Sequence, residues 1–364
     1  MTEAPKAGSL TADPIAGLEG VVVAHTALSD VDGQNGRLVL RGKPIEELAG
    51  KATFEEAVRH LWYSYIFSDL TTLLQAFGAA RAEAFATVPV LEAAASGLSI
   101  YERMQVGLSA LPLSQDRPHP ISISAALPVF LAASFRLANG EMPIAPDPRL
   151  SMAEDLLTMM FGNTSDADHV AALDRYLVTI LDHGLNASTF TARVIGSTEA
   201  NLKQAVLGAM GALSGPLHGG APGPVLDMID AIGTPGNAEA WIGEALARKE
   251  RLMGFGHRIY RTRDPRADVL KDGLKALATT TPKVKLAEDI ETAALAALKK
   301  ARPGRVLDTN VEFYTAVLLD AIGIDRRLFT PLFAVGRTPG WCAHVMEQQE
   351  TGKLIRPASV YVGP

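Results

Sequence analysis

Ser214-Gly-Pro-Leu-His-Gly-Gly-Ala-Pro-Gly-Pro224 is a run of glycine and proline in a sequence that otherwise shows helical patterns. Two further stretches of this kind follow, Met253-Gly-Phe-Gly-His-Arg258 and Gly336-Arg-Thr-Pro-Gly340. Helical proteins use such segments where the backbone turns sharply or approaches a ligand closely. Each of the three also contains a histidine or an arginine. The sequence therefore predicts helices with three interruptions, and these are the places to look for chemistry.

Helical patterns fill most of the chain between these stretches. Thr53-Phe-Glu-Glu56 and Ser151-Met-Ala-Glu154 are capping boxes, and each predicts a helix that begins directly after it. Apolar periodicity predicts further helices at about 70–86, 99–110, 170–182, 199–212, 238–249, 286–300 and 311–322. The fold class predicted is mostly α.

Strand signals are nearly confined to the first 45 residues. A valine-rich run covers 20–25, and Asn35-Gly36 precedes the β-prone run 37–41. Asn-Gly between such runs is typical of a hairpin. We therefore expect a small N-terminal β-hairpin, and a further strand signal lies in the last ten residues.

Length, charge and composition exclude several classes of protein. The 364 residues are enough for two domains, and the formal net charge of −6 gives no overall attraction to nucleic acid or anionic membrane. The 48% of hydrophobic residues exclude global disorder. The apolar stretch 121–138 contains Pro128 and Arg136, so we expect a buried core helix there. The N-terminus lacks the pattern of a signal peptide, and we expect a cytoplasmic protein.

The single cysteine, Cys342, excludes an internal disulfide framework and a thiolate metal cluster. The sequence also lacks the motifs of P-loops, dinucleotide-binding loops, EF-hand calcium loops, zinc metalloproteases and serine hydrolases. No metal site is predicted. Any chemistry must therefore come from histidine, arginine and carboxylate side chains.

Two of the eight histidines lie beside glycines in the interrupted stretches. We expect His218 and His257 just before helices, where the helix dipole disfavours an imidazolium ion and keeps the ring neutral. A neutral imidazole can donate a hydrogen bond to a carbonyl or an enol. The pair therefore suits carbonyl polarisation, whereas His60 and His344 fall within helical patterns and are interpreted as structural.

Arg266, Arg337 and Arg356 are expected in loops, and arginine can bind a carboxylate through two hydrogen bonds. Each could instead be a solvated surface residue, but three of them beside such stretches favour a small polyanionic substrate. Glu312 begins a strongly apolar helix at 313–319. It is either a dipole partner of that helix or the carboxylate that a proton transfer requires.

In these segments the sequence resembles citrate synthase, and the resemblance runs from about Leu18 to Pro364. The segment 20–33 with Arg41-Gly42 resembles the hairpin of that family. The other segments that carry the resemblance, in the order and spacing of the family, are Asp182-His-Gly-Leu-Asn-Ala-Ser188, Gly215-Pro-Leu-His-Gly-Gly-Ala221, Gly254-Phe-Gly-His-Arg-Ile-Tyr260, Asp264-Pro-Arg-Ala267, Asn310-Val-Glu-Phe-Tyr314, Leu328-Phe-Thr-Pro-Leu-Phe-Ala-Val335 and Leu354-Ile-Arg-Pro357.

The resemblance implies a two-domain helical fold, a homodimer, and a cleft that closes over oxaloacetate and acyl-CoA. Residues 1–218 and 316–364 would form the large domain, whose C-terminal part reaches the partner subunit, and 219–315 the small domain. The implied activity is an acyl transfer, the condensation of acetyl-CoA with oxaloacetate in the tricarboxylic acid cycle. Coenzyme A would enter as part of the substrate, and no tightly bound cofactor, metal, nucleic acid or membrane is implied.

The resemblance also implies roles for individual residues. His218 would stabilise the enol of acetyl-CoA, Glu312 would remove its methyl proton, and His257 would polarise the ketone of oxaloacetate. The residues implied to bind oxaloacetate or line its pocket are His183, Asn186, Arg266, Arg337, Asn310 and, reaching into the site of the partner subunit, Arg356. Those implied to contact coenzyme A are Arg261 at the phosphates and Leu252, Gly254, Phe255 and Gly256 around the adenine, with Asn310 nearby.

Three residues depart from the usual pattern of the family: Glu312 replaces an aspartate, Gly184 a glutamate and Ala358 an arginine. The extra methylene of Glu312 must be absorbed by backbone or rotamer, because proton transfer tolerates little misplacement. The chain also lacks the N-terminal extension of the NADH-regulated hexameric forms, so we expect a dimer without that allosteric site.

Two alternatives to citrate synthase stay open at this point. A 2-methylcitrate synthase would use propionyl-CoA, which differs from acetyl-CoA by one methyl group, and such a difference is hard to read from a sequence. A non-catalytic paralogue would bind coenzyme A or a tricarboxylate without turnover. The glutamate at position 312 is the main support for this second alternative.

Overall fold

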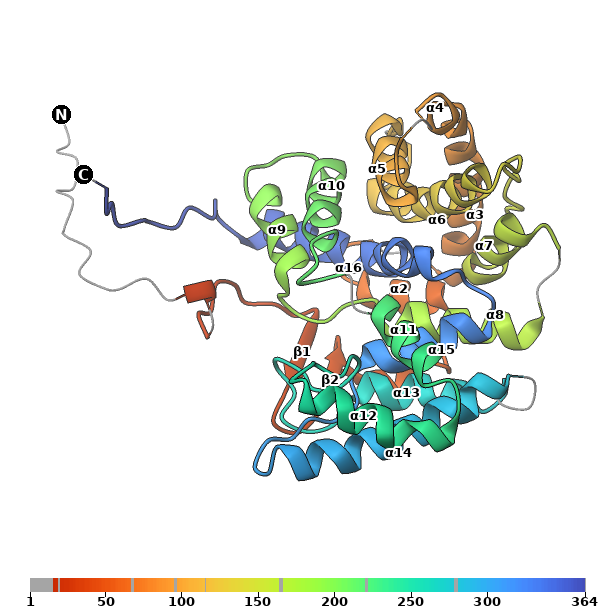
Figure 1. The fold of residues 1–364 in the computed structure, drawn as a ribbon. Helices are drawn as coiled ribbons and strands as arrows, with labels where there is room; N and C mark the ends of the chain where they lie inside the picture. Colours follow the sequence, from red (N-terminus) through yellow and green to blue (C-terminus); the bar gives the residue numbers. More distant parts are fainter. Residues whose placement is uncertain are drawn as a thin grey trace.

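A computed structural model describes residues 16–363, apart from 19, 67–68, 95–96, 115, 164–165, 220–221 and 278–280. Residues 1–15 of the predicted large domain therefore lie outside the described residues. The described residues form sixteen α-helices, three short 3-10 helices and one three-stranded sheet (Figure 1). The prediction of a mostly α fold with a small N-terminal hairpin is confirmed.

The sheet is antiparallel and contains β1 (Ser29–Asp32), β2 (Arg37–Leu40) and β3 (Lys43–Pro44). Asn35-Gly36 lies in the turn between β1 and β2, and Gly36 has a positive φ of 63°. The expected strand at 20–25 is wrong, because this segment has no strand partner and the first strand begins at Ser29. The last ten residues also contain no strand in their described part.

One group of helices lies in the upper part of Figure 1, where α6 packs against α3, α5, α7 and α16, and α9 packs against α10 and α16. The helices of this group are α3 (Leu70–Phe85), α4 (Val88–Ala93), α5 (Ile100–Ala110), α6 (His119–Ala138), α7 (Met152–Phe161), α9 (Ala187–Gly196) and α10 (Leu202–Leu213). The chain also contains the 3-10 helices η1 (Ala16–Leu18) and η3 (Arg326–Leu328).

A second group, in the lower part of Figure 1, covers most of the predicted small domain, and its last helix continues past the predicted boundary at 315. Its helices are α11 (Pro222–Ile232), α12 (Ala238–Ala247), α13 (Pro265–Gly273), α14 (Pro282–Ala301) and α15 (Val311–Ala321), with η2 (Pro235–Asn237). α15 packs against α11, α13 and α14, and α12 packs on α14. The remaining helices are α1 (Ile45–Leu48), α2 (Phe54–Leu61), α8 (Ala167–Thr179) and α16 (Phe329–Thr351); α8 contacts both groups.

The helix starts follow the predicted caps. Thr53 and Glu56 form a complete capping box at α2, with both reciprocal hydrogen bonds. Ser151 accepts a hydrogen bond from the backbone N–H of Glu154 at the start of α7. Such caps satisfy backbone N–H groups that the helix itself leaves unpaired.

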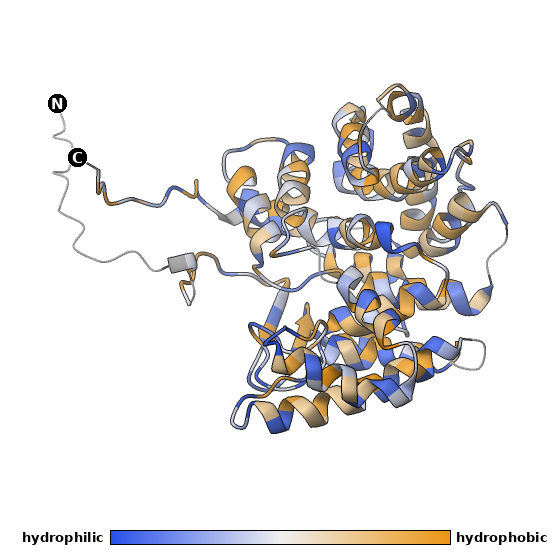
Figure 2. Cartoon of the chain, in the orientation of Figure 1, coloured by the Kyte–Doolittle hydropathy of each residue, from blue (hydrophilic) through white to orange (hydrophobic). Residues whose placement is uncertain are grey.

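The predicted core helix at 121–138 is confirmed as part of α6. Among the described residues, α6 is the one helix that is long and apolar enough to cross a membrane, but 78% of its most apolar window is buried inside the protein. Figure 2 shows orange hydrophobic residues throughout the helices packed around it. Burial of this kind is typical of a core helix.

The predicted interruption at 336–340 is wrong, because α16 runs through it from Phe329 to Thr351. A Cβ atom added at Gly336 would lie 2.6 Å from Ile180 Cδ1, and one added at Gly340 would lie 2.3 Å from the carbonyl oxygen of Leu181. The two glycines therefore allow α16 to lie directly against the segment 180–182, and they do not break the helix.

We predict that Gly340→Ala destabilises the protein by about 1–3 kcal/mol, because the new methyl group meets rigid backbone. Gly211→Ala in α10 is the matched control, since no heavy atom lies within 4 Å of its added Cβ. There the better helix propensity of alanine is expected to be neutral or stabilising by up to about 1 kcal/mol. Thermal and urea unfolding of both variants tests this, and equal midpoints for the two would contradict the close contact.

Candidate active site

A cavity of about 760 Å³ is lined by residues from all three predicted segments, 1–218, 219–315 and 316–364. Pockets of this size accommodate small organic ligands. The predicted site residues that line it are His183, Asn186, His218, Gly256, His257, Arg266, Asn310, Glu312 and Arg337. The structure thus brings residues more than 150 positions apart into one hollow.

The elements that position these residues differ in part from expectation. His183 and Asn186 lie between α8 and α9, and His218 lies in the turn that follows α10. Arg266 and Arg337 were expected in loops, and this is wrong. Arg266 is the second residue of α13, after Pro265 and the N-cap Asp264, and Arg337 lies within α16. Helical backbone fixes both guanidinium groups more firmly than a loop would.

The ring of His257 is oriented by backbone hydrogen bonds. Its Nδ1 accepts from the N–H groups of Ile259 (3.0 Å) and Tyr260 (3.1 Å), so a neutral ring carries its proton on Nε2. Burial, and then the charge of Arg266, lower the pKa of His257 to about 4. The cause is not a helix N-terminus, because the next helix begins only at Pro265.

The Nε2 of His257 lies 3.4 Å from Nη2 of Arg266. Both nitrogens carry hydrogen when the histidine is neutral, so neither satisfies the other. Both can donate to a single oxygen placed between them. Such a pair of donors is suited to a ketone or carboxylate oxygen of a bound substrate.

His218 is held by a hydroxyl group that the sequence reasoning did not single out. Its Nε2 lies 2.8 Å from Ser188 Oγ, and Trp341 Nε1 donates to the same oxygen at 3.1 Å. Burial, and then the charge of Arg337, lower the pKa of His218 to about 4. The ring is therefore neutral near pH 7, as the sequence indicated, although burial is the main cause.

His183 completes a cluster of rings with His257 and Tyr260. Its Nε2 lies 3.0 Å from the Tyr260 hydroxyl, and the two histidine rings are 5.8 Å apart and nearly perpendicular. Burial, followed by the charges of Arg266 and Arg337, lowers the pKa of His183 well below its usual value. Three neutral histidines therefore face the same cavity.

The two buried arginines are fixed differently. Arg266 forms a two-pronged pair with Asp264 (3.0 and 2.9 Å), and Asp264 also accepts from the backbone N–H of Val311 at 3.1 Å. This carboxylate therefore ties α13 to the start of α15. Arg337 is 1% exposed, donates from Nε to the carbonyl of Ile180, and lies over the ring of Phe333. Burial lowers its pKa to about 10, so it stays charged at neutral pH.

Glu312 is the cavity's carboxylate and lies in the first turn of α15. Its backbone N–H donates to the side chain of Asn310, the N-cap, at 3.0 Å. Within the described part of the chain the carboxylate itself makes no hydrogen bond or ion pair. Burial raises the pKa of Glu312, while Arg266 and Arg251 oppose the rise. A base with a raised pKa and no structural partner is available for proton transfer.

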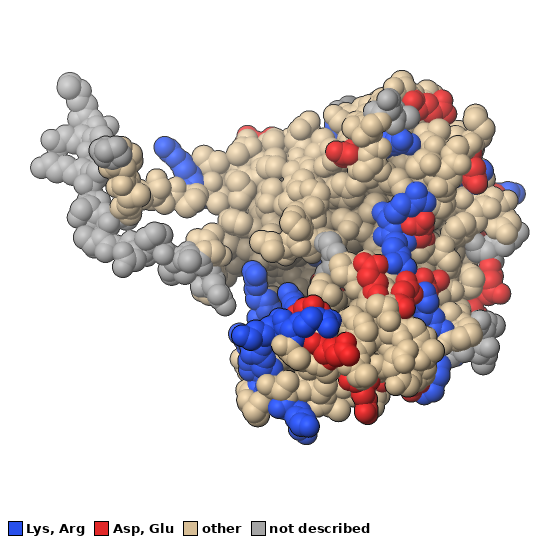
Figure 3. Space-filling view, viewed as in Figure 1, with Lys and Arg blue, Asp and Glu red and all other residues tan. Residues whose placement is uncertain are grey.

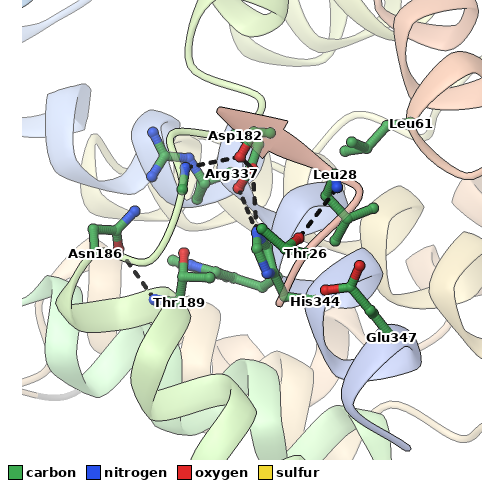
Figure 4. A network of polar contacts seen from close by, with 12 residues as sticks. Thr26, Leu28, Leu61, Asp182, Asn186, Thr189, Arg337, His344 and Glu347 are labelled. Atoms are coloured by element: carbon green, nitrogen blue, oxygen red, sulfur yellow. Dashed lines mark hydrogen bonds and ion pairs between the residues drawn. The ribbon is translucent and has the colours of Figure 1, made fainter. Parts of the chain in front are cut away.

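Behind the cavity lies a buried polar network that connects distant parts of the chain (Figure 4). Asp182 accepts from Ser29 Oγ and from His344 Nε2. Nδ1 of His344 accepts from Arg193 at 2.9 Å, and Arg193 pairs with Glu347 at 2.7 Å. Figure 4 shows the side chains of Arg337 and His344 on either side of Asp182. His344, expected to be structural, thus links the site to α9.

Some polar groups near the cavity have no partner in the described structure. Asn186 accepts at Oδ1 from Ser188 and from the N–H of Thr189, whereas its Nδ2 is buried and unpaired. Buried unpaired donors are rare in folded proteins, because each loses its hydrogen bonds to water. Since Asn186 lines the cavity, its amide N–H is placed to donate to a ligand.

Two arginines of the cavity wall were missed by the sequence reasoning. Arg251 and Arg258 both line it and are exposed. With Arg266 and Arg337 they make the wall strongly basic. In Figure 3, Lys and Arg side chains also gather at the left of the lower helix group. A cationic wall with neutral histidines favours an anionic ligand.

Several predicted residues lie outside the cavity wall. Arg261 is exposed, and its backbone N–H donates to Gly33. Leu252, Gly254 and Phe255 are buried; Gly254 accepts from the N–H of Asn310 at 2.9 Å, and Phe255 packs on Phe313. Arg356 is exposed on the C-terminal segment, which runs away from the body in Figure 1. The structure therefore does not bring Arg356 to the cavity of its own chain.

Within the described residues, no group of three or more His, Cys, Asp or Glu side chains is arranged to hold a metal ion. The one cysteine of the chain, Cys342, is fully buried in α16, and burial raises the pKa of its thiol to about 12.

Comparison with known proteins identifies the family of the chain. Residues 17–358 match the family model "Citrate synthase, C-terminal domain". The chain is 36% identical to 2-methylcitrate synthase of Mycobacterium tuberculosis (95% of this chain, 90% of the relative) and 35% identical to citrate synthase 2 of Bacillus subtilis (96% and 95%). It also resembles citrate synthase of Thermoplasma acidophilum, solved as a ternary complex with carboxymethyl coenzyme A and oxaloacetate, with a TM-score of 0.83, 26% identity and 96% coverage of each chain. The chain belongs to the citrate synthase family, whose members are enzymes that catalyse a condensation.

Proposed function

We propose that the chain condenses acetyl-CoA with oxaloacetate and then hydrolyses citryl-CoA to citrate and coenzyme A. The single observation that carries this proposal is the composition of the cavity wall. Neutral His218 and His257, buried Arg266 and Arg337 and the unpartnered carboxylate of Glu312 all line one cavity. Condensation requires such a set: cations for a dianionic acceptor, neutral donors for two carbonyl groups, and a base.

Oxaloacetate is proposed to bind at the Arg266–His257–Arg337 side of the cavity. The two guanidinium groups stay charged at neutral pH and can bind its carboxylates. The ketone oxygen would lie between Nε2 of His257 and Nη2 of Arg266, which are 3.4 Å apart and both carry hydrogen. Their hydrogen bonds draw electron density from the ketone carbon and make it more electrophilic. The free N–H of Asn186 can hold a further oxygen.

The acyl-CoA is proposed to react between His218 and Glu312. Glu312 removes a proton from the carbon next to the thioester carbonyl, and His218 donates a hydrogen bond to the oxygen on which negative charge develops. A carboxylate is too weak a base for this carbon without that donor, so the two residues must act together. Nε2 of His218 contacts Ser188, so Nδ1 would be the donor, and this requires the single hydroxyl hydrogen of Ser188 to turn from Asn186 to Nε2.

The new carbon–carbon bond then joins this carbon to the ketone carbon of oxaloacetate, whose oxygen takes up a proton. Water next cleaves the thioester of the product, and coenzyme A leaves as a thiol. The charged groups at the mouth of the cavity, Arg251 and Arg258, are placed to contact phosphates of coenzyme A, with exposed Arg261 further out.

Residues 219–315 are proposed to move as a small domain that closes this cavity. The helices α11 to α14 of this segment and α15, which begins in it, pack on one another, and the cavity wall is divided between this segment and the rest of the chain. Closure would exclude water while the carbanion-like intermediate exists.

A homodimer is proposed on the basis of the C-terminal segment. Leu354, Tyr361 and Val362 are 58%, 80% and 91% exposed, and the segment extends from the body in Figure 1. Apolar side chains at such exposure are typical of a surface that another chain covers. In that arrangement Arg356 would reach the site of the partner subunit. A cytoplasmic location fits an enzyme that uses these metabolites and remains part of the proposal.

Propionyl-CoA is the second candidate donor, and the product would then be 2-methylcitrate. The relative from Mycobacterium tuberculosis named 2-methylcitrate synthase is as similar to this chain as the relative named citrate synthase 2, at 36% and 35% identity. One methyl group in a pocket changes binding by only about 1–3 kcal/mol. The non-catalytic alternative has less support, because Glu312 lines the cavity together with both histidines.

We predict release of free coenzyme A when the protein is mixed with oxaloacetate and acetyl-CoA. Comparison of kcat/KM for acetyl-CoA and propionyl-CoA decides between the two donors, and we expect the higher value for acetyl-CoA. A higher value for propionyl-CoA would favour 2-methylcitrate synthase. No thiol release with either donor would favour the binding-only alternative.

We predict that Glu312→Gln lowers kcat at least a hundredfold, because the amide cannot accept the proton. Oxaloacetate binding, measured by calorimetry, is expected to change little. Glu288→Gln on α14 is a control for loss of one carboxylate, since Glu288 lies outside the cavity wall. A Glu312→Gln enzyme with normal kcat would remove Glu312 from the role of base.

The pH dependence of kcat provides a separate test. Burial raises the pKa of Glu312, and only its ionised form can act as a base, so activity should rise with pH through a value above the usual glutamate pKa. His218 and His257, with pKa values of about 4, are already neutral in this range. We expect Glu312→Asp to change the pH at which kcat falls on the acid side of the profile, which is its acid limb. An acid limb near 6.5 that is identical in both enzymes would instead indicate a histidine.

A further inference from the structure

We propose that Glu291 is a positioning residue that sets the relative placement of His257, Arg266 and Glu312. It lies on α14, outside the cavity wall, and touches no residue to which a catalytic role has been given. The inference rests on the proposed function, because it assigns Glu291 a role in the reaction of those three residues.

The carboxylate of Glu291 accepts hydrogen bonds from four side chains, which belong to three segments of the chain. Its Oε1 accepts from Thr309 Oγ1 at 2.6 Å and from Arg263 Nη1 at 3.2 Å. Its Oε2 accepts from Lys271 Nζ at 2.6 Å and from the Tyr314 hydroxyl at 2.5 Å. Both oxygens are thus fully used, and the residue is only 4% exposed.

Each donor lies on a segment that carries a site residue. Arg263 belongs to the loop of His257, and Lys271 lies one and a half turns after Arg266 on α13. Thr309 immediately precedes Asn310, whose side chain caps the backbone N–H of Glu312. Tyr314 follows Glu312 on α15.

One carboxylate therefore holds together the three segments of the lower helix group that face the cavity. Other contacts also join these segments: Asn310 donates to Gly254, Asp264 pairs with Arg266 and accepts from Val311, and Arg263 pairs with Asp268 and Asp308. Glu291 differs from these groups because it also fixes the three segments to α14. Displacement of Glu291 would consequently shift Glu312, His257 and Arg266 relative to one another.

The charge of Glu291 is part of this arrangement. Burial alone would raise its pKa, but Lys271, Thr309, Tyr314 and Arg263 together lower it. Two of the four partners are cations, and a neutral side chain would remove the counter-ion of Lys271, whereas Arg263 would keep Asp268 and Asp308. An amide in place of the carboxylate would also turn one oxygen into a donor that faces two other donors. Glu291→Gln therefore disrupts these hydrogen bonds and ion pairs, although the side chain keeps nearly the same size.

The test compares wild type, Glu291→Gln and Asp289→Asn by kcat with acetyl-CoA and with acetyl-CoA deuterated at the methyl group. Asp289 lies on the same helix and pairs with exposed Lys285, so its variant removes a carboxylate away from the site. We expect Glu291→Gln to lower kcat by roughly tenfold to a hundredfold, as for a small misplacement of reacting groups. The deuterium isotope effect should rise, because proton removal becomes slower relative to the later steps.

Thr309→Val and Tyr314→Phe keep the test decisive if Glu291→Gln does not fold. Each removes one hydrogen bond to Glu291 with almost no change of shape, and each should also raise the isotope effect. A merely structural role would lower the amount of folded enzyme and leave the isotope effect as in wild type, and that result would overturn the proposal. Wild-type enzyme that releases no coenzyme A would instead contradict the proposed function itself.

Discussion

The contact between α16 and the segment 180–188 is the interaction on which the rest of the cavity depends. Arg337 donates to Ile180, Trp341 to Ser188, and His344 to Asp182, and Gln348 accepts from Arg193. These four residues of α16 are spaced by four, three and four positions, so they share one face of the helix. A single helix thereby fixes His183, Asn186 and Ser188, and the glycines at 336 and 340 let it approach closely enough.

The other half of the cavity is organised by carboxylates. Asp264 joins Arg266 to the start of α15, and Glu291 joins α13, α14, α15 and the loop of His257. Buried carboxylates of this kind are stable only when cations and hydroxyl donors surround them. The side chains of the two halves are therefore held in different ways: one face of α16 holds those of the first half, and ion pairs and hydrogen bonds of buried carboxylates hold those of the second.

Much of the fold was readable in the sequence because its signals are local. Capping residues marked helix starts at Thr53 and Ser151, and Asn35-Gly36 marked the hairpin turn. The site residues came from segments that resemble a known family, and nine of them share the cavity wall.

Other features depend on contacts between distant residues. Gly336 and Gly340 resembled a helix break, because the packing surface they fit, Ile180 and Leu181, lies more than 150 positions away. The start of α13 could have been read from Asp264 and Pro265, an N-cap followed by proline at the first helical position. Glu291 carried no signal, since its four partners come from three segments that are separate in the sequence. Cys342 has a last consequence: with its thiol buried and protonated, the enzyme has no sulfur able to form a mixed disulfide with the coenzyme A that it releases, so its product cannot trap it under oxidising conditions.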